Sequence, residues 1–160
     1  MQHSGTFLTS RAPSEVFELL GTPERFAPLL PDYESMVMQD PTHFSLRTVI
    51  ALGEMSGHAN LAMELAEVER PTVIVYRGQG IVAGSQLNLV LQFRVSRTDT
   101  STEVSWQGEF SLEGGLAFMM ASLIEPMGRE HFERMAERLH EKLNPAETTV
   151  DVLPSPETGQ

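Results

Sequence analysis

The residues best suited to acid–base or metal chemistry in this sequence are five histidines, His3, His43, His58, His131 and His140. Their spacing does not group them into a set of metal ligands. Glu137 and His140 have the Glu-x-x-His spacing of carboxylate-bridged metal sites, but such sites take ligands from several long helices and this sequence predicts only one. Pairs of opposite charge four residues apart, such as Glu130 and Arg134, are typical of a solvated helix face. We therefore expect no metal ligand.

No pattern predicts a catalytic nucleophile or a phosphate-binding loop. The sequence has no cysteine, which excludes disulfides, thiolate metal centres and cysteine nucleophiles, and it has no nucleophile elbow. Gly78, Gly80 and Gly84 do not precede a predicted helix, so we interpret them as turn and bulge glycines. Residues 81–83 would then form a bent connection rather than a regular strand. We assign no catalytic residue and no cofactor.

The methionines are more informative. Met119, Met120 and Met127 lie on the first half of a predicted long helix, and Met63 is expected to face them from a sheet. Methionine is flexible and polarizable, and it is common on surfaces that accept varied apolar ligands. Ordinary core packing is the alternative. We favour a ligand cavity, for which about 300–1,000 Å³ would be usual.

The candidate ligand-contact residues come from the inward faces of the predicted strands and from the first half of the helix. Few of them are polar, and Thr48, the Trp106 N–H, Tyr76 and Tyr33 are too few for acid–base catalysis but enough to orient a ligand. The predicted set is Leu46, Thr48, Met63, Tyr76, Leu89, Leu91, Phe93, Trp106, Phe110, Phe118, Met119, Met120, Leu123, Ile124 and Met127.

A strand followed by one long helix must position these side chains. Residues 103–113 alternate between apolar and polar, which is the period of a half-buried strand. After Gly114 and Gly115, apolar residues recur at helical spacing up to Leu143, and at about 1.5 Å per residue such a helix would span roughly 40 Å. Pro126 lies inside this segment and predicts a kink or break, which we interpret as a bend that lets the helix follow the sheet, with a hinge at the cavity mouth as the alternative.

The rest of the chain predicts a sheet with two short helices near its start. Residues 6–9 form a first strand, and helices begin at Pro13 and Pro23, where a proline suits the first helical position. Between residues 33 and 113 only strand segments separated by turns are expected, at 33–39, 43–52, 59–65, 73–76, 87–96 and 103–113. The predicted fold is therefore α+β, with a curved antiparallel sheet of about seven strands around a long C-terminal helix.

Composition limits the organisation and the partners. The chain has 160 residues, 41% of them hydrophobic, which suits one domain over 1–143, and 144–160 has three prolines and reads as a flexible acidic tail. The net charge of −11 argues against a nucleic-acid partner. The longest apolar run, 115–124, is about half the ~20 residues of a membrane-spanning helix. With no signal-peptide pattern, we expect a cytoplasmic protein.

This order of elements resembles the helix-grip fold of the START-like (SRPBCC) superfamily. Over about residues 4 to 143 the sequence resembles the carbon monoxide dehydrogenase G-subunit family. The matching segments are GTF at 5–7, APSEVF at 12–17, LP at 30–31, GEMSG at 53–57, GQG at 78–80 with Gly84, TEVSW at 102–106 and GGLA at 114–117. One departure is Asp32, which follows Pro31 where the family commonly has a glycine.

The resemblance implies a noncatalytic protein that binds or carries a small apolar molecule, such as a quinone or lipid. It also implies a partner, a molybdenum hydroxylase of the carbon monoxide dehydrogenase type, and is compatible with peripheral membrane contact. An enzyme of the polyketide cyclase or dehydratase type is one alternative and would need a buried carboxylate, histidine or tyrosine converging on the cavity. A pure interaction domain, with a filled interior, is another.

Overall fold

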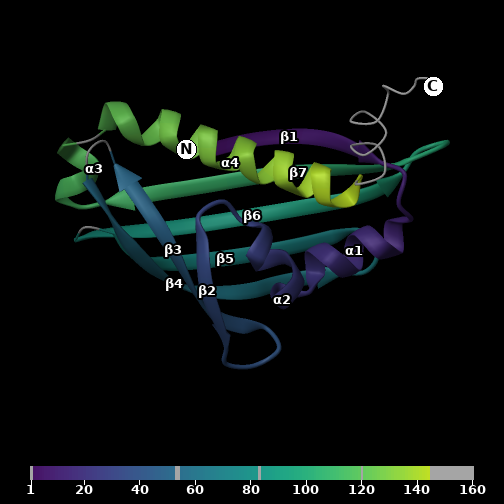
Figure 1. Ribbon diagram of the computed structural model, residues 1–160, viewed down its shortest axis with the longest axis horizontal. Coiled ribbons are helices and arrows are strands. Elements are labelled where there is room, and N and C mark those ends of the chain that lie inside the picture. The colour runs from purple at the N-terminus through teal and green to yellow at the C-terminus, as the bar shows by residue number, and fades with distance from the viewer. Residues whose placement is uncertain (1, 53–54, 83, 120, 145–160) are drawn as a thin grey trace, which may run out of the picture.

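The computed structural model describes residues 2–52, 55–82, 84–119 and 121–144, which form one curved sheet with helices on one face (Figure 1). The predicted α+β helix-grip architecture is confirmed. The elements are β1 (Gln2–Thr9), α1 (Pro13–Gly21), α2 (Pro23–Phe26), the 3-10 helix η1 (Ala27–Leu29), β2 (Tyr33–Met38), β3 (His43–Leu52), β4 (Met55–Glu69), β5 (Val73–Val82), β6 (Ser85–Arg97), β7 (Thr102–Glu113), α3 (Gly115–Met119) and α4 (Ala121–Leu143).

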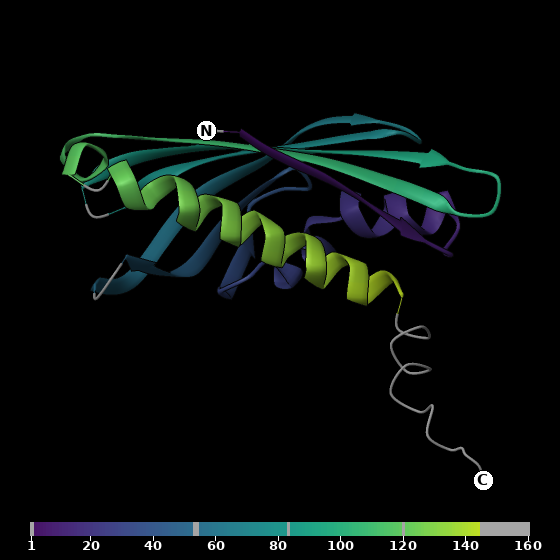
Figure 2. The ribbon, with the colours of Figure 1, turned by 90° about the horizontal axis from the view of Figure 1, so that it is seen from above.

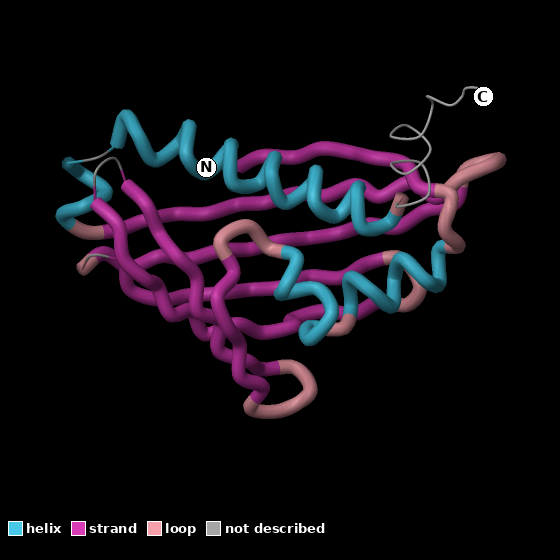
Figure 3. Tube along the Cα trace, viewed as in Figure 1, coloured by secondary structure: helices cyan, strands magenta, loops and turns pink. Residues whose placement is uncertain are grey.

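The seven strands form one antiparallel sheet in the order β1-β7-β6-β5-β4-β3-β2. Six of them follow one another as a meander, and β1 pairs along its whole length with β7, from Gln2 opposite Glu109 to Thr9 opposite Thr102. The sheet curls so that its β2–β4 edge swings toward the helices (Figure 2). All the described helices lie on this concave side (Figure 3).

The long C-terminal helix is present as α3 and α4, on either side of residue 120, which lies outside the described residues. Of the kink or break predicted at Pro126, the break is absent, because α4 continues through this residue (Figure 2). Pro126 and Ser122 are both exposed, so water can bind the Ser122 carbonyl that lacks its usual helical N–H donor.

The prediction that residues 81–83 form a bent connection is also wrong for the described part of that segment. β5 continues to Val82 and pairs on both sides, with Gly80 opposite Leu61 of β4 and Leu87 of β6. The two β5 glycines serve packing, because a Cβ at Gly78 would collide with the Met63 sulfur and a Cβ at Gly80 with the Asn60 carbonyl oxygen. The turn glycine is Gly84, whose φ is +81°.

One half of the concave face is filled by aromatic side chains beneath α1 and α2. Phe26 stacks on Tyr76 with ring centroids 4.8 Å apart and meets Phe93 edge-on at 5.4 Å. The Tyr76 hydroxyl donates a 2.6 Å hydrogen bond to the Leu20 carbonyl, one of the last carbonyls of α1, and burial raises the pKa of Tyr76 well above its usual range. We call this region the packed half.

The C-terminal end of α4 is tied to β1 and the segment after it. Thr9 Oγ1 and Arg11 Nε donate to the Leu143 carbonyl at 3.0 and 3.2 Å. Asn144 is buried, and its amide donates to the carbonyls of Leu8 at 3.3 Å and His140 at 2.9 Å. The predicted tail at 144–160 therefore begins with a residue packed against the domain, and the rest of it lies outside the described residues.

Candidate ligand-binding site

A cavity of about 480 Å³ lies between α4 and the sheet, in the half that α1 and α2 do not fill. Its volume falls within the usual range for small-molecule sites. Its walls are mainly leucine, phenylalanine, methionine and valine. The lining residues are Phe26, Leu30, Asp32, Leu46, Thr48, Val49, Leu61, Met63, Val82, Leu87, Leu89, Leu91, Phe110, Leu112, Ile124, Met127, Gly128, Glu130, His131, Phe132, Arg134 and Met135.

Two sequence periods build the walls. On β6, Leu87, Leu89 and Leu91 line the cavity at every second position, as neighbours on one face of a strand must. On α4, the lining residues recur three or four positions apart, from Ile124 through Met127 to His131. Gly128 also faces inward, and its lack of a side chain lets the Phe110 ring lie against the helix backbone, since a Cβ there would collide with that ring.

The structure places part of the predicted contact set around this cavity. The predicted residues that line it are Leu46, Thr48, Met63, Leu89, Leu91, Phe110, Ile124 and Met127. Their role as ligand contacts remains a prediction. Tyr76, Phe93 and Trp106 are buried in the core and do not line the cavity.

Three further predicted residues, Phe118 and Met119 of α3 and Leu123 of α4, do not line the cavity. Phe118 is 91% exposed, Met119 81% and Leu123 43%, while Met120 lies outside the described residues. Phe118 and Met119 lie six and five positions before the buried Ile124, which puts them well away from its face of a helix, and Leu123 lies one position off that face.

Sequence reasoning missed other lining residues for different reasons. Leu61, Leu87 and Leu112 follow the strand alternation, and that signal could have included them. Phe132 lies on the same face of α4 as Ile124 and Met135, but helical spacing counted from Met127 predicts the adjacent His131 for that face. Asp32 and Arg134 reach the site through contacts between segments far apart in the sequence, which no local pattern predicts.

Thr48 and His131 are the neutral polar side chains of the lining with unused hydrogen-bonding groups. Thr48 is 6% exposed, and its hydroxyl has no hydrogen-bond partner within the described ranges. Burial lowers the pKa of His131, an effect that the Asp32 carboxylate opposes and the Arg134 charge reinforces. His131 is therefore neutral at pH 7, with one ring nitrogen that donates and one that accepts.

An ion pair links the loop before β2 to α4 at the edge of the cavity. Arg134 Nη2 donates to Asp32 Oδ2 at 2.8 Å, and Arg138 Nη1 donates to the Leu30 carbonyl at 3.4 Å. Asp32 has a φ of +63°, a left-handed conformation that glycine adopts freely and aspartate tolerates better than most residues. Asp32 stands where the family commonly has a glycine. It keeps the left-handed backbone that suits glycine, and it adds a carboxylate that pairs with Arg134 of α4.

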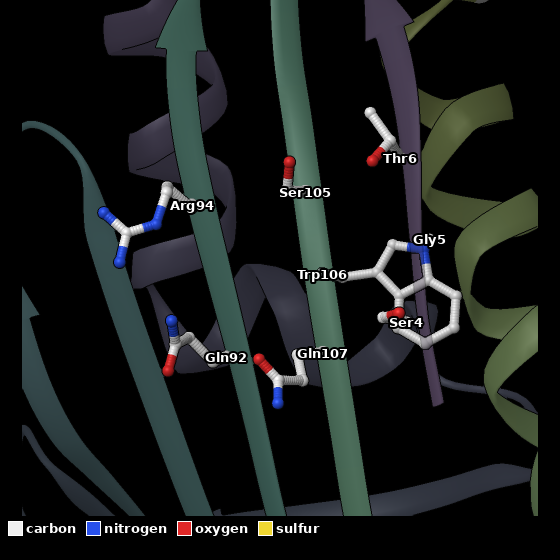
Figure 4. A pocket seen from close by; sticks show the side chains of 8 residues that line it. All are labelled: Ser4, Gly5, Thr6, Gln92, Arg94, Ser105, Trp106 and Gln107. Atoms are coloured by element: carbon white, nitrogen blue, oxygen red, sulfur yellow. The ribbon is translucent and has the colours of Figure 1, made fainter. Parts of the chain in front are cut away.

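A second hollow, of about 300 Å³, lies on the sheet over β1, β7 and β6 (Figure 4). Short polar side chains and one arginine line most of it: Ser4, Thr6, Gln92, Arg94, Ser105 and Gln107, with Gly5 and Trp106. Most of the polar side chains are exposed to solvent. The hollow therefore lacks the apolar enclosure of a site for an apolar molecule.

Solved structures share this fold at low sequence identity. A conserved protein from Geobacillus kaustophilus has a TM-score of 0.76 and 11% identity, over 92% of this chain and 97% of that one. A START superfamily protein from Mycobacterium smegmatis has a TM-score of 0.61 and 12% identity, over 89% and 96%. The di-domain ARO/CYC StfQ from the steffimycin biosynthetic pathway has a TM-score of 0.62 and 8% identity, over 93% of this chain and 52% of StfQ.

The chain has the START-like, helix-grip fold, which the START superfamily protein from Mycobacterium smegmatis shares. Within that class, the chain belongs to the carbon monoxide dehydrogenase G-subunit (CoxG) family, whose pattern it matches over residues 5–144. None of the curated proteins compared is detectably similar in sequence. In the part of the chain that the structure describes, no helix is both long and apolar enough to cross a membrane.

Proposed function

We propose that this protein binds and carries a small apolar molecule, quinone- or lipid-like, in the cavity between α4 and the sheet. The observation that carries the proposal is the combination of a 480 Å³ volume with a mainly aliphatic, aromatic and methionine lining. Transfer of apolar surface from water into such a lining is favourable. Met63, Met127 and Met135 give the walls side chains that can adapt to different ligand shapes.

Membership of the CoxG family supports a role beside a molybdenum hydroxylase of the carbon monoxide dehydrogenase type, on the cytoplasmic side of a membrane. The exposed side chains of Phe118, Met119 and Leu123 give the α3–α4 junction an apolar surface, and residues 114–124 contain no charged residue. A surface of this kind suits peripheral contact with a bilayer, where an apolar ligand would be collected or released. The carrier would then move its ligand between membrane and enzyme.

An enzyme of the cyclase type is the alternative that one observation favours. His131 lines the cavity and could exchange a proton with a bound molecule. Acid–base chemistry, however, needs positioned groups with distinct roles, and the carboxylate near His131, Asp32, is partly exposed and paired with Arg134. A single neutral imidazole fits ligand orientation better than catalysis, and we therefore place the carrier first.

Native mass spectrometry of the purified full chain tests the carrier function. The protein would be measured as isolated and after incubation with decylubiquinone or with a monoacylglycerol, and its denatured mass would exclude covalent adducts. Met127→Trp fills the cavity from α4, and Leu123→Trp adds the same side chain four residues earlier on the exposed face. We expect a noncovalent adduct on the wild type and on Leu123→Trp, and its loss in Met127→Trp. A bare wild-type mass with both probes, or equal loss in the two variants, contradicts the proposal.

A further inference from the structure

Two uncharged polar side chains of the cavity lining, Thr48 and His131, are both connected to Asp32. Thr48 on β3 precedes Val49, whose N–H donates a 2.9 Å hydrogen bond to the Asp32 carbonyl. The Asp32 carboxylate is bound by Arg134, which lies one helical turn after His131 on α4. Asp32 also acts electrostatically on His131. Thr48 and His131 are therefore both connected to Asp32, Thr48 through the next residue of the sheet wall and His131 through the charge that Asp32 sets beside the helix wall.

Most of the remaining lining is apolar. Leu87, Leu112 and Met127 pack against Val82 and Ala59, and Ala59 lies directly opposite Thr48 in the sheet. Thr48 and His131 are thus uncharged polar groups set in a largely apolar lining, and we call them the polar pole of the cavity. The polar atoms of a molecule that fills the cavity would lie toward these two side chains.

Neither group of the polar pole is used by the protein itself. Thr48 is buried, yet its hydroxyl has no hydrogen bond among the residues described. The His131 ring contacts Phe132, with centroids 6.3 Å apart, but no described residue hydrogen-bonds its nitrogens. Both side chains line the cavity, so their hydrogen-bonding groups are open to the water or the ligand that fills it.

We propose that Thr48 and His131 bind an oxygen-bearing head group, so that the cavity selects neutral molecules with a carbonyl or hydroxyl oxygen on an apolar body. The Thr48 hydroxyl and one His131 N–H can both donate to such an oxygen. The charged residues of the lining are Asp32, Glu130 and Arg134. The charges of Arg134 and Asp32 offset each other in their ion pair. The Glu130 carboxylate therefore gives the lining a net negative charge, which disfavours a ligand with a carboxylate head group. This assignment rests on the proposed carrier function and narrows its ligand class.

Three aromatic probes of matched shape separate the head-group effect from cavity filling. 2-Methyl-1,4-naphthoquinone carries two carbonyl oxygens, 2-methylnaphthalene carries none, and 2-naphthoate carries a carboxylate. Dissociation constants for the full chain would be measured by isothermal titration calorimetry. We expect the wild type to bind the quinone about 2- to 10-fold more tightly than the hydrocarbon, as one or two neutral hydrogen bonds allow, and to bind 2-naphthoate most weakly.

The variants Thr48→Val and His131→Phe remove the polar groups with little change of volume. Each is expected to bring the quinone-to-hydrocarbon affinity ratio toward one without weakening binding of 2-methylnaphthalene, and Thr48→Ser should restore the ratio. His140→Phe removes an exposed histidine from the same helix and serves as the control. Thermal unfolding of each variant checks that it folds.

The outcomes distinguish this inference from the function on which it rests. Binding of both uncharged probes with equal affinity, or a ratio unchanged in Thr48→Val and His131→Phe, overturns the head-group assignment and leaves the carrier function standing. Failure of every probe to bind the wild type contradicts both. Tightest binding of 2-naphthoate would also overturn the assignment, because it would show that the pole selects an anion.

Discussion

The two halves of the concave face use the same kind of sequence but differ in how completely side chains fill them. In the packed half, Leu20, Phe93 and Tyr76 are fully buried beneath α1 and α2. In the half that holds the cavity, which we call the open half, Leu87, Leu89 and Leu112 remain only partly buried although they alternate just as regularly. Leu89 and Phe93 even lie on the same face of the same strand. The alternation decides which face a residue occupies, and the elements across from it decide whether the space is filled.

The covering helices account for the difference. α1 and α2 bring large side chains down onto β5 and β6, with Phe26 between Tyr76 and Phe93. The first part of α4 brings a methionine and a glycine, Met127 and Gly128, to the corresponding position over the open half. Protein interiors are otherwise close-packed, so the unfilled half is the feature of the fold that the proposed binding function would use.

The largest expected contrast comes from the same truncation in the two halves. Leu20→Ala removes a fully buried side chain and should lower the free energy of unfolding by about 3–5 kcal/mol, since it leaves a cavity in a close-packed region. Leu89→Ala removes a partly buried side chain that already borders empty space, and should lower it by about 1–2 kcal/mol. Urea denaturation of both variants measures the difference. Equal losses would show that the open half is as tightly packed as the other.

Enlarging the same two side chains should also lower stability more in the packed half than in the open half. Leu20→Phe must force a ring into filled space and is expected to lower stability by about 1–3 kcal/mol. Leu89→Phe can extend into the cavity and should change stability by less than about 1 kcal/mol, while it weakens ligand binding. Denaturation midpoints and native mass spectrometry measure the two effects together. A destabilised Leu89→Phe that still binds ligand would contradict this description of the open half.

The sequence allows the framework and one face of each strand to be predicted, but not which half is filled. Alternation at 103–113 predicts β7, and Pro13 and Gly21 predict the limits of α1. The packing role of the two β5 glycines depends on Met63 and Asn60 of the next strand, so their spacing alone indicates turns. The outward position of Phe118 and Met119 could have been predicted, because neither residue is three or four positions from Ile124 on the buried face. The Asp32–Arg134 pair joins residues 102 positions apart, so it too depends on tertiary contact.

His131, in the lining of the open half, should make the free energy of unfolding depend on pH. Burial holds the pKa of His131 below its usual value, so as the pH falls below about 6.5 the unfolded chain takes up a proton before the folded chain does. The contribution of this residue to stability is therefore complete above pH 6.5 and is lost as the pH falls toward the folded-state pKa. His131→Phe should reduce the dependence of the unfolding free energy on pH in this window.

Nuclear magnetic resonance of the His131 ring protons measures the same shift directly. Asp32→Asn removes the carboxylate that raises the His131 pKa, and the pKa should fall further. His43 offers an internal contrast, because its hydrogen bond to Asp40 raises its pKa above the usual value. If His131 titrated at or above 6.5, the imidazole would be solvated, and its place in the lining of the cavity would have to be revised.

The smallest expected effect concerns Asp32, at the edge of the open half. Its ion pair with Arg134 is partly exposed, so its loss should lower stability by only about 0.2–1 kcal/mol. In Asp32→Gly the φ of +63° suits the new residue, and the relief of backbone strain should offset part of that loss. Asp32→Ala loses the same ion pair but keeps the strain of a side chain at positive φ, and should be about 1 kcal/mol less stable than Asp32→Gly. Equal stability of the two variants would mean that the loop before β2 relaxes to a negative φ in Asp32→Ala, so that the positive φ costs this variant nothing.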